Sequence, residues 1–237
     1  MKAFLRKIST VAFTLMVTLT FLIVPFTDTA HAEWDVREMD YSKSVTVVKY
    51  KDTDTHHYGI DMTKQLKNAK KVKVKSSKKG ILSDVGEAFN YIVFYADKAG
   101  TTTLKVNVTK KSGKKVTYKI KVRVLNSKKI FKSVKLGRKN CTKKLIQDNE
   151  NGIKYKAKTG KISIKPADGW RLYGKIRYYS EKGDPYDPFE KGVLYKKTYK
   201  NNQRIKFRKG CTNHTIYFKM KHKKTGLIEY FTLHIDR

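Results

Sequence analysis

The feature that most constrains the fold is a strict alternation of apolar and polar residues in several short segments. The clearest case is residues 116–124, where Val, Tyr and Ile alternate with Thr, Lys and Arg. Successive side chains of a β-strand point to opposite faces, so this period favours strands with one face in a core and one in water. Helical periodicity is nearly absent. The sequence therefore predicts an all-β protein.

Similar segments recur along the chain and are separated by turn residues. The Lys-rich, Gly-containing segments 110–114 and 223–226 predict hairpin turns. Many short strands at this spacing predict two consecutive β-sandwich domains, residues 33–126 and 127–237. The other expected strands are residues 45–50, 71–75, 90–95, 103–108, 152–158, 161–165, 174–179, 193–199, 204–208, 215–220 and 228–235.

Residues 1–32 have the pattern of a secretory signal peptide. Basic residues stand at positions 2, 6 and 7, an uncharged apolar stretch of 16 residues covers 11–26, and Ala30-His31-Ala32 supplies a cleavage site. A transmembrane anchor is the competing interpretation, but 16 residues are short for a hydrocarbon layer of about 30 Å. We therefore expect an exported chain with no membrane span after cleavage.

The charge is strongly basic and unevenly distributed. Lys and Arg number 54 against 20 Asp and Glu, which gives a net charge of +34. Without residues 1–32, which hold three basic residues and Asp28, the charge is +32, and +21 of it lies on residues 127–237. Such a field attracts polyanions. Part of the Lys excess is equally explained by an AT-rich genome.

The balance of Lys and Arg bears on which polyanion is expected. Lys outnumbers Arg 45 to 9, whereas Arg is the residue suited to bidentate recognition of bases. Nucleic acid is therefore a disfavoured partner for this exported chain. Point charges on Lys suit teichoic acid, an acidic glycan or an anionic lipid surface.

The segments 66–80 and 96–106, with their Ser-Ser and Ala-Gly-Thr turns, resemble a bacterial immunoglobulin-like domain of group 2, the intimin/invasin type. The resemblance covers about residues 43–126, and it departs from the family where Val74 and Lys75 replace the usual Trp. It implies an Ig-like sandwich and a non-catalytic display or adhesion module of secreted or cell-surface bacterial proteins. By analogy the second half is a diverged Ig-like sandwich.

The candidate polyanion-binding residues are basic side chains that are closely spaced in the second half. They are Lys196, Lys197, Lys200, Arg204, Lys206, Arg208 and Lys209.

A cluster of aromatic residues precedes them and suggests a platform on which sugar rings stack. Alternation sends about half of any strand's residues inward, so a core role is the competing interpretation. The platform candidates are Trp170, Tyr173, Tyr178 and Tyr179.

Two cysteines, Cys141 and Cys211, exclude an iron–sulfur protein, a structural zinc module and a cysteine-rich miniprotein. In an exported chain they either form a disulfide or remain free thiols. The segment 52–58 with Asp61 contains acid and imidazole groups, but adjacent His residues in an extended chain point apart. A solvated loop is therefore favoured over a metal site.

An acidic patch in the second half lacks the regular spacing of a calcium loop and is interpreted as a surface loop. It consists of Glu181, Asp184, Asp187 and Glu190. No phosphate-binding loop, nucleophile elbow or zinc-protease motif is present. The sequence thus predicts no catalytic residues, no metal and no cofactor.

The sequence as a whole predicts an exported, non-catalytic binding or adhesion protein with two consecutive Ig-like β-sandwiches. We expect it to be secreted, or held without a covalent bond at the surface of a Gram-positive bacterium. The expected partner is an anionic envelope polymer or an acidic glycan. The alternative is a structural spacer or assembly subunit with a protein partner and an incidental charge.

Overall fold

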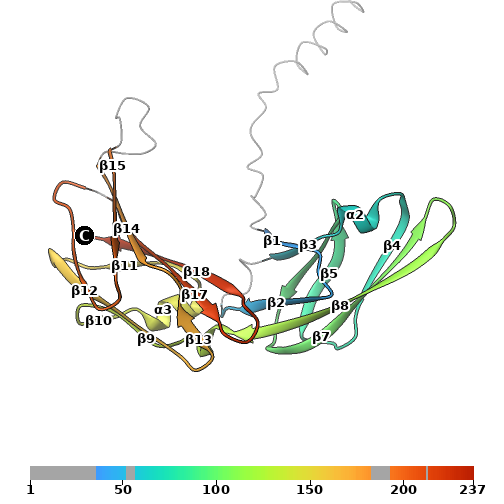
Figure 1. Ribbon diagram of the computed structural model, residues 1–237, viewed down its shortest axis with the longest axis horizontal. Helices are drawn as coiled ribbons and strands as arrows, with labels where there is room; N and C mark the ends of the chain where they lie inside the picture. The colour runs from blue at the N-terminus through green and yellow to red at the C-terminus, as the bar shows by residue number, and fades with distance from the viewer. Residues whose placement is uncertain (1–35, 52–56, 183–192, 212) are drawn as a thin grey trace, which may run out of the picture. The chain divides into compact units, whose positions relative to one another are not determined.

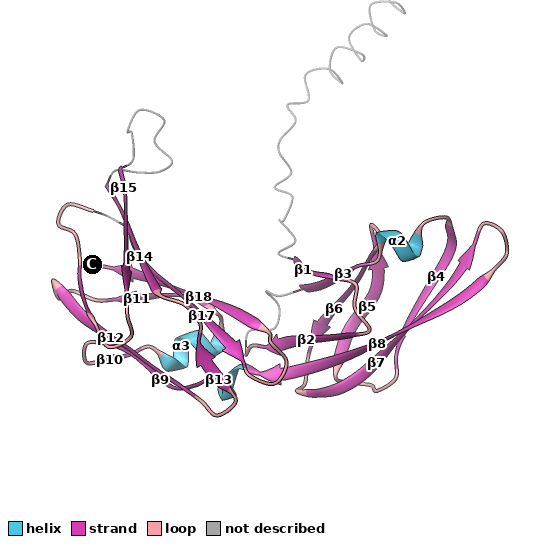
Figure 2. Cartoon of the chain, in the orientation of Figure 1, coloured by secondary structure: helices cyan, strands magenta, loops and turns pink. Residues whose placement is uncertain are grey.

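The computed structural model describes residues 36–51, 57–182, 193–211 and 213–237. The predicted signal peptide lies outside the described residues. Strands predominate in the described part, as Figure 2 shows, and the predicted all-β fold is confirmed. Residues 36–237 form one compact unit. This unit contains two hydrophobic cores, each built from side chains of two sheets.

The first core lies between two four-stranded sheets with the strand orders β1-β3-β6-β5 and β2-β8-β7-β4 (Figure 1). Their alternate side chains, such as Ile60, Phe94, Leu104 and Ile120, are fully buried. The elements are β1 (Val36–Asp40), β2 (Ser44–Lys49), β3 (His57–Asp61), α2 (Thr63–Leu66), β4 (Ala69–Ser76), β5 (Leu82–Ala88), β6 (Tyr91–Ala96), β7 (Gly100–Lys110) and β8 (Lys115–Asn126).

The second core lies between a sheet of order β10-β9-β12-β16 and a sheet of order β11-β18-β17-β14-β15, in which β13 also pairs with β17. The elements are η2 (Ser127–Lys129), β9 (Phe131–Leu136), β10 (Lys139–Asn140), α3 (Thr142–Gln147), β11 (Glu150–Lys154), β12 (Thr159–Pro166), β13 (Trp170–Leu172), β14 (Ile176–Lys182), β15 (Val193–Tyr199), β16 (Arg204–Lys206), β17 (Asn213–His222) and β18 (Ile228–Asp236).

Local turn chemistry explains the longest hairpin. β7 and β8 pair from Gly100–Val124 to Thr109–Lys115. The Lys110 N–H donates to the Lys114 carbonyl at 2.9 Å, and Gly113 has a φ of +83°, a conformation that glycine adopts without a steric cost. The predicted turn at residues 110–114 is therefore confirmed.

The loop expected over residues 52–58 is wrong at its end. His57 and Tyr58 begin strand β3, which pairs with β1 on one side and β6 on the other. The Tyr58 ring is buried and stacks on Phe94 with their centroids 5.8 Å apart. Tyr58 is therefore a core residue of a strand and not part of a solvated loop. Residues 52–56 lie outside the described residues.

A partly buried ion pair joins β1 to β18: the Glu229 carboxylate is buried and the Arg37 side chain is 21% exposed. Arg37 Nη1 donates to Glu229 Oε2 at 3.2 Å, and the Tyr50 hydroxyl donates to the same oxygen at 2.8 Å. Arg37 Nη2 also donates to Asn149 Oδ1 at 2.5 Å. Burial raises the pKa of Tyr50 well above its usual value, so its proton stays available for this hydrogen bond. Val48 and Tyr50 belong to the second core although they precede residue 126, and the predicted boundary at that residue stays a prediction.

We expect Glu229→Leu to lower the free energy of unfolding by about 1–3 kcal/mol, because the partly buried charge of Arg37 would lose its carboxylate and the Tyr50 hydroxyl would lose its Glu229 acceptor. The double variant Arg37→Met/Glu229→Leu removes both charges and should recover much of that loss. Urea unfolding of the two single variants and the double variant measures the coupling. A loss below about 0.5 kcal/mol for Glu229→Leu would contradict the structural importance of the pair.

Candidate functional site

Alternation sets the direction of the side chains at residues 204–209. Ile205 and Phe207 are buried, so Lys206 and Arg208 point to solvent. The Phe207 N–H donates to the Lys158 carbonyl at 3.0 Å, which attaches this segment to the start of β12. The segment 206–211 thereby becomes one wall of a cavity.

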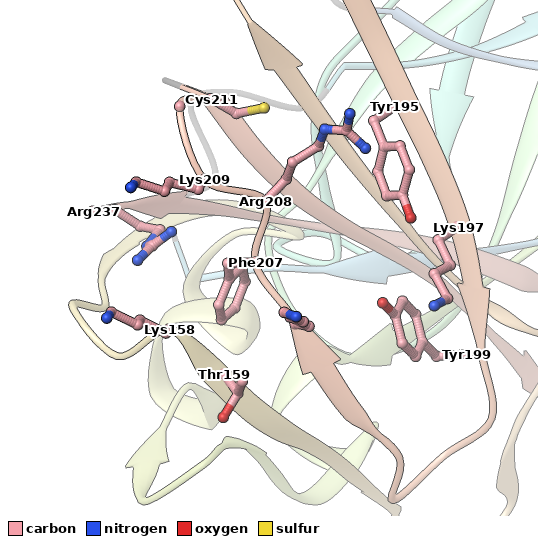
Figure 3. A pocket seen from close by; sticks show the side chains of 12 residues that line it. Lys158, Thr159, Tyr195, Lys197, Tyr199, Phe207, Arg208, Lys209, Cys211 and Arg237 are labelled. Atoms are coloured by element: carbon pink, nitrogen blue, oxygen red, sulfur yellow. The ribbon is translucent and has the colours of Figure 1, made fainter.

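The cavity has a volume of about 780 Å³ and opens between strand β15, the segment 206–211, the start of β12 and the C-terminal residue. In Figure 3 the side chains of β15 lie on one side and those of Lys158, Lys209 and Arg237 on the other, with Phe207 and Arg208 between them. The lining residues are Lys158, Thr159, Tyr195, Lys197, Tyr199, Lys206, Phe207, Arg208, Lys209, Gly210, Cys211 and Arg237.

Six of these lining residues are cations and none is acidic. In the described part of the chain, none of the six forms an ion pair. Three of them lie near aromatic rings instead: Arg208 is 4.6 Å from the centroid of Tyr195, Lys197 is 5.6 Å from Tyr199, and Arg237 is 5.6 Å from Phe207. A recess lined by cationic side chains and by no acidic ones concentrates anions.

The buried ring of Tyr178 lies behind the cavity wall. Its hydroxyl is 2.7 Å from Nδ1 of His214 and accepts the Arg208 N–H at 3.1 Å. Ser180 and His214 face each other as partners of β14 and β17, and Ser180 Oγ and His214 Nε2 have no hydrogen-bond partner among the described residues. Buried polar atoms left in this state are rare, so this layer holds spare hydrogen-bonding capacity.

Four of the seven predicted polyanion-binding residues meet at the cavity: Lys197, Lys206, Arg208 and Lys209. The other three, which are exposed, do not line it. Lys196 pairs with Tyr179 on the opposite face of β15, and the remaining two are Lys200 and Arg204.

Sequence reasoning missed two cations of the cavity, Lys158 and Arg237. The pairing of Thr159 with Lys206 brings Lys158 to the site. That pairing joins segments more than 40 positions apart, and no local pattern signals it. Arg237 follows β18, whose residues 228–235 were expected as a strand, but its approach to Phe207 depends on how the two sheets pack.

The predicted aromatic platform divides into two groups. Trp170 and Tyr178 are buried in the second core, so these two assignments are corrected to core positions. Both side chains point to the core side of their strands, Trp170 from β13 and Tyr178 from β14. Tyr173 is exposed and Tyr179 is half-buried, and both lie on the outer side of the sheet.

The cysteines are free thiols, so a disulfide between them is not formed. Cys141 is buried in the second core at the start of α3, whereas Cys211 is half-buried in the cavity wall. Burial raises the pKa of the Cys141 thiol, which keeps it protonated and unreactive.

The acidic and imidazole residues singled out in the sequence lie partly within the described residues. His57 and Asp61 stand at the two ends of β3, and Glu181 pairs with Leu194 in β14. Asp184, Asp187 and Glu190 lie outside the described residues. Within residues 36–51, 57–182, 193–211 and 213–237, no group of three or more His, Cys, Asp or Glu side chains is placed to hold a metal ion. In the same residues no helix is long and apolar enough to span a membrane.

Comparison with known proteins gives β-sandwich neighbours. No family model and no curated protein matches the chain. Among solved structures, the fibronectin(III)-like modules of Clostridium thermocellum CbhA are 13% identical with a TM-score of 0.28, over 71% of this chain and 77% of theirs. Mouse clustered protocadherin PcdhgC3 EC1–3 is 11% identical with a TM-score of 0.24, and the match covers 81% of this chain and 64% of that one, which is less than two thirds. The finer assignment to the intimin/invasin type has no matching family model.

Burial lowers the pKa of His214 below its usual value, and the positive charge of Arg237 lowers it further, against an opposing effect of the Cys211 backbone. The unfolded chain then binds a proton near pH 6.5 that the folded chain does not bind. We expect the free energy of unfolding to fall as the pH falls from 7 toward the lowered pKa. The His214 contribution is at most about 1.4 kcal/mol per pH unit.

His214→Gln keeps an acceptor for the Tyr178 hydroxyl and removes the titration. Denaturant unfolding of the wild type and this variant at pH 7, 6 and 5 measures the two slopes. The variant should have the shallower one, and equal slopes would show that His214 does not titrate as described.

Proposed function

We propose that this protein is an exported, non-catalytic binding module that is held on a polymer of the bacterial envelope by its basic cavity. The polymer carries repeated anionic groups, either the phosphates of a teichoic acid or the carboxylates of an acidic glycan. The observation that carries the proposal is the cavity itself, in which six cations converge without one acidic side chain.

The six cations come from four separate parts of the chain: the start of β12, strand β15, the segment 206–211 and the last residue. A run of Lys that merely solubilises a strand gives separate charges on an open face. Here the fold gathers distant charges around one recess, and mutual repulsion makes that arrangement unfavourable unless an anion enters.

The aromatic rings of the wall suit a polymer that has organic units between its anions. Tyr195, Tyr199 and Phe207 give the cavity apolar walls beneath the cations. Four of the six cations are Lys, and this flexible point charge accommodates many anion positions. We therefore expect broad recognition of an anionic polymer and a steep loss of affinity with salt.

The second candidate function is a rigid spacer or assembly subunit that binds a protein partner. The partly buried contacts of Arg37 with Glu229 and Asn149 favour it, because they attach β1 to the second core. This candidate predicts that retention on an anionic polymer does not depend on the cavity residues.

Co-sedimentation of the purified protein with Gram-positive cell walls across a salt series separates the two candidates. The triple variant Lys206→Gln/Arg208→Gln/Lys209→Gln should bind on the order of 100-fold more weakly, since each basic residue contributes about 1 kcal/mol near an anionic surface. The matched control Lys73→Gln/Lys75→Gln/Lys105→Gln removes the same charge from exposed positions of β4 and β7 and should bind as the wild type does.

Walls stripped of teichoic acid, and beads carrying a carboxylated glycan, distinguish the two sources of anions. Binding lost on stripped walls identifies the phosphate polymer, and bead binding that the triple variant loses identifies the carboxylate. Equal weakening of the two triple variants, or no binding of the wild type at low salt, would overturn the proposal.

A further inference from the structure

Exposed apolar side chains concentrate on one face of the second sandwich. The large hydrophobic residues exposed in the described part are Phe89, Tyr173, Leu194 and Tyr230, at 93%, 39%, 50% and 46% exposure. Phe89 stands alone between β5 and β6. Leu194 and Tyr230 belong to β15 and β18 of a single sheet, and Tyr173 directly follows β13 of the same sheet.

Tyr173 and Tyr230 flank Lys219, because the Tyr173 N–H donates to the Lys219 carbonyl and Lys219 pairs with Tyr230. Leu194 lies toward the other end of the sheet, where its partner Glu181 pairs with Asn213. Neighbouring exposed rings such as Tyr173 and Tyr230 mark a candidate binding surface.

The strand register places these residues on the side of the sheet that faces away from the core. Tyr178, Ile216, Phe218 and Phe231 point into the core, so their chain neighbours point outward. We call the resulting surface the outer tyrosine face. It consists of Tyr173, Arg177, Tyr179, Tyr217, Lys219, Lys221 and Tyr230.

The members of the outer tyrosine face contact one another in pairs of rings and cations. The rings of Tyr217 and Tyr230 lie with their centroids 5.9 Å apart. Lys219 Nζ is 4.8 Å from the centroid of Tyr230, and Lys221 Nζ is 5.1 Å from that of Tyr173. A cation therefore stands beside each of the two most exposed rings.

The face is basic along its length. Arg177 is the Cα partner of Tyr217, and Lys219 is that of Tyr230. Among the described residues, the acidic groups on this side of the sheet stand toward its ends: Glu181 opposite Leu194, Glu150, which is 2.7 Å from His234, and Asp236 at the end of β18. The centre of the face thus offers aromatic rings and positive charge together.

We propose that the outer tyrosine face binds an acidic polysaccharide by stacking sugar rings on its tyrosines and pairing sugar carboxylates with its lysines. This surface is separate from the basic cavity, because Lys196 and Lys197 of β15 point to opposite sides of the sheet. This inference rests on one part of the proposed function, namely that the protein is exported, and it does not depend on the cavity.

The chemistry of the face selects this ligand. Tyr has a flat apolar ring with a polar edge, which matches the apolar ring face and hydroxyl rim of a sugar. Lys219 sits on a flexible stem and can turn from the Tyr230 ring to a carboxylate, which uncovers the ring. A lipid surface would instead require Trp, Phe or Leu for insertion. Among the described residues, Leu194 is the one exposed large aliphatic side chain, and the exposed Phe89 lies between β5 and β6, away from this face.

Affinity electrophoresis in gels containing hyaluronate tests the proposal, with dextran as the uncharged polysaccharide and single-stranded DNA as the competing stacking polymer. Tyr173→Ala/Tyr230→Ala should weaken hyaluronate binding about 10-fold or more, as loss of exposed aromatic anchors does. Tyr173→Phe/Tyr230→Phe keeps the rings and should restore most of it. Phe89→Ala is the matched control and should have no effect.

Salt separates this face from the cavity. Stacking resists screening, so about half a molar salt should spare part of the hyaluronate binding. The cavity variant Lys206→Gln/Arg208→Gln/Lys209→Gln should keep hyaluronate binding even where it loses cell walls.

Each of three results would overturn the inference: unchanged binding in the Ala pair, stronger binding of single-stranded DNA than of hyaluronate, or loss of hyaluronate in the cavity variant alone. The last result would leave the proposed function standing. The converse result is a protein that binds hyaluronate through the tyrosines and does not bind cell walls. That result would overturn the proposed function and support the outer tyrosine face as a binding surface.

Discussion

The hydroxyl of Tyr178 is the polar group on which the candidate site depends. Its ring is fully buried, so the hydroxyl must find partners inside the protein. It finds His214 Nδ1 on the neighbouring strand and the backbone N–H of Arg208 in the segment after β16. The second contact fixes the backbone at Arg208. The cations of that segment therefore stand at the rim of a cavity instead of on a free loop.

Aromatic packing around Tyr178 supports the same arrangement. Its ring meets those of Tyr195, Tyr199 and Phe207 edge to face, with centroids 5.9–6.4 Å apart. Such contacts add to the energy of burial and restrict the angles of the rings. Tyr195 and Tyr199 also line the cavity, so the residues that stabilise the core at this end shape the recess as well.

A single strand divides the charge of the second sandwich between two surfaces. Alternation along β15 directs Lys197 into the cavity and Lys196 to the outer face, where Tyr179 is its partner. Adjacent basic residues of a strand point to opposite sides, so Lys196 and Lys197 cannot both enter the cavity. The high Lys content of the chain is therefore compatible with two binding surfaces of different character, one rich in cations and one in which tyrosines and cations mix.

Period and turn chemistry made much of the fold predictable. The hairpins around Gly113 and Gly226 were expected because Gly follows a Lys-rich strand end, and both glycines have a positive φ. Strand β1, with the sequence VREMD, was missed because its alternation is weak and its burial depends on parallel pairing with β3.

The faces of the strands were predicted less well than their positions. Tyr178 and Tyr179 are adjacent and point to opposite sides. The charged Arg177 and Glu181 share a side with Tyr179, so alternation within β14 identified Tyr178 as the core residue, but the interpretation as an aromatic platform treated the two rings alike. The cavity was also predicted only in part. Four of its cations lie close together in sequence, but Lys158 reaches it through a pairing with β16 that no local pattern reveals.

The most direct test of the central claim uses Cys211, which is half-buried in the cavity wall, while Cys141 is buried elsewhere in the core. The rate of its alkylation by uncharged iodoacetamide reports whether a polymer occupies the cavity. Teichoic acid at low salt should slow the reaction several-fold, and high salt should restore the rate. A polymer that binds the protein, yet leaves the Cys211 rate unchanged, would contradict a cavity-based mechanism.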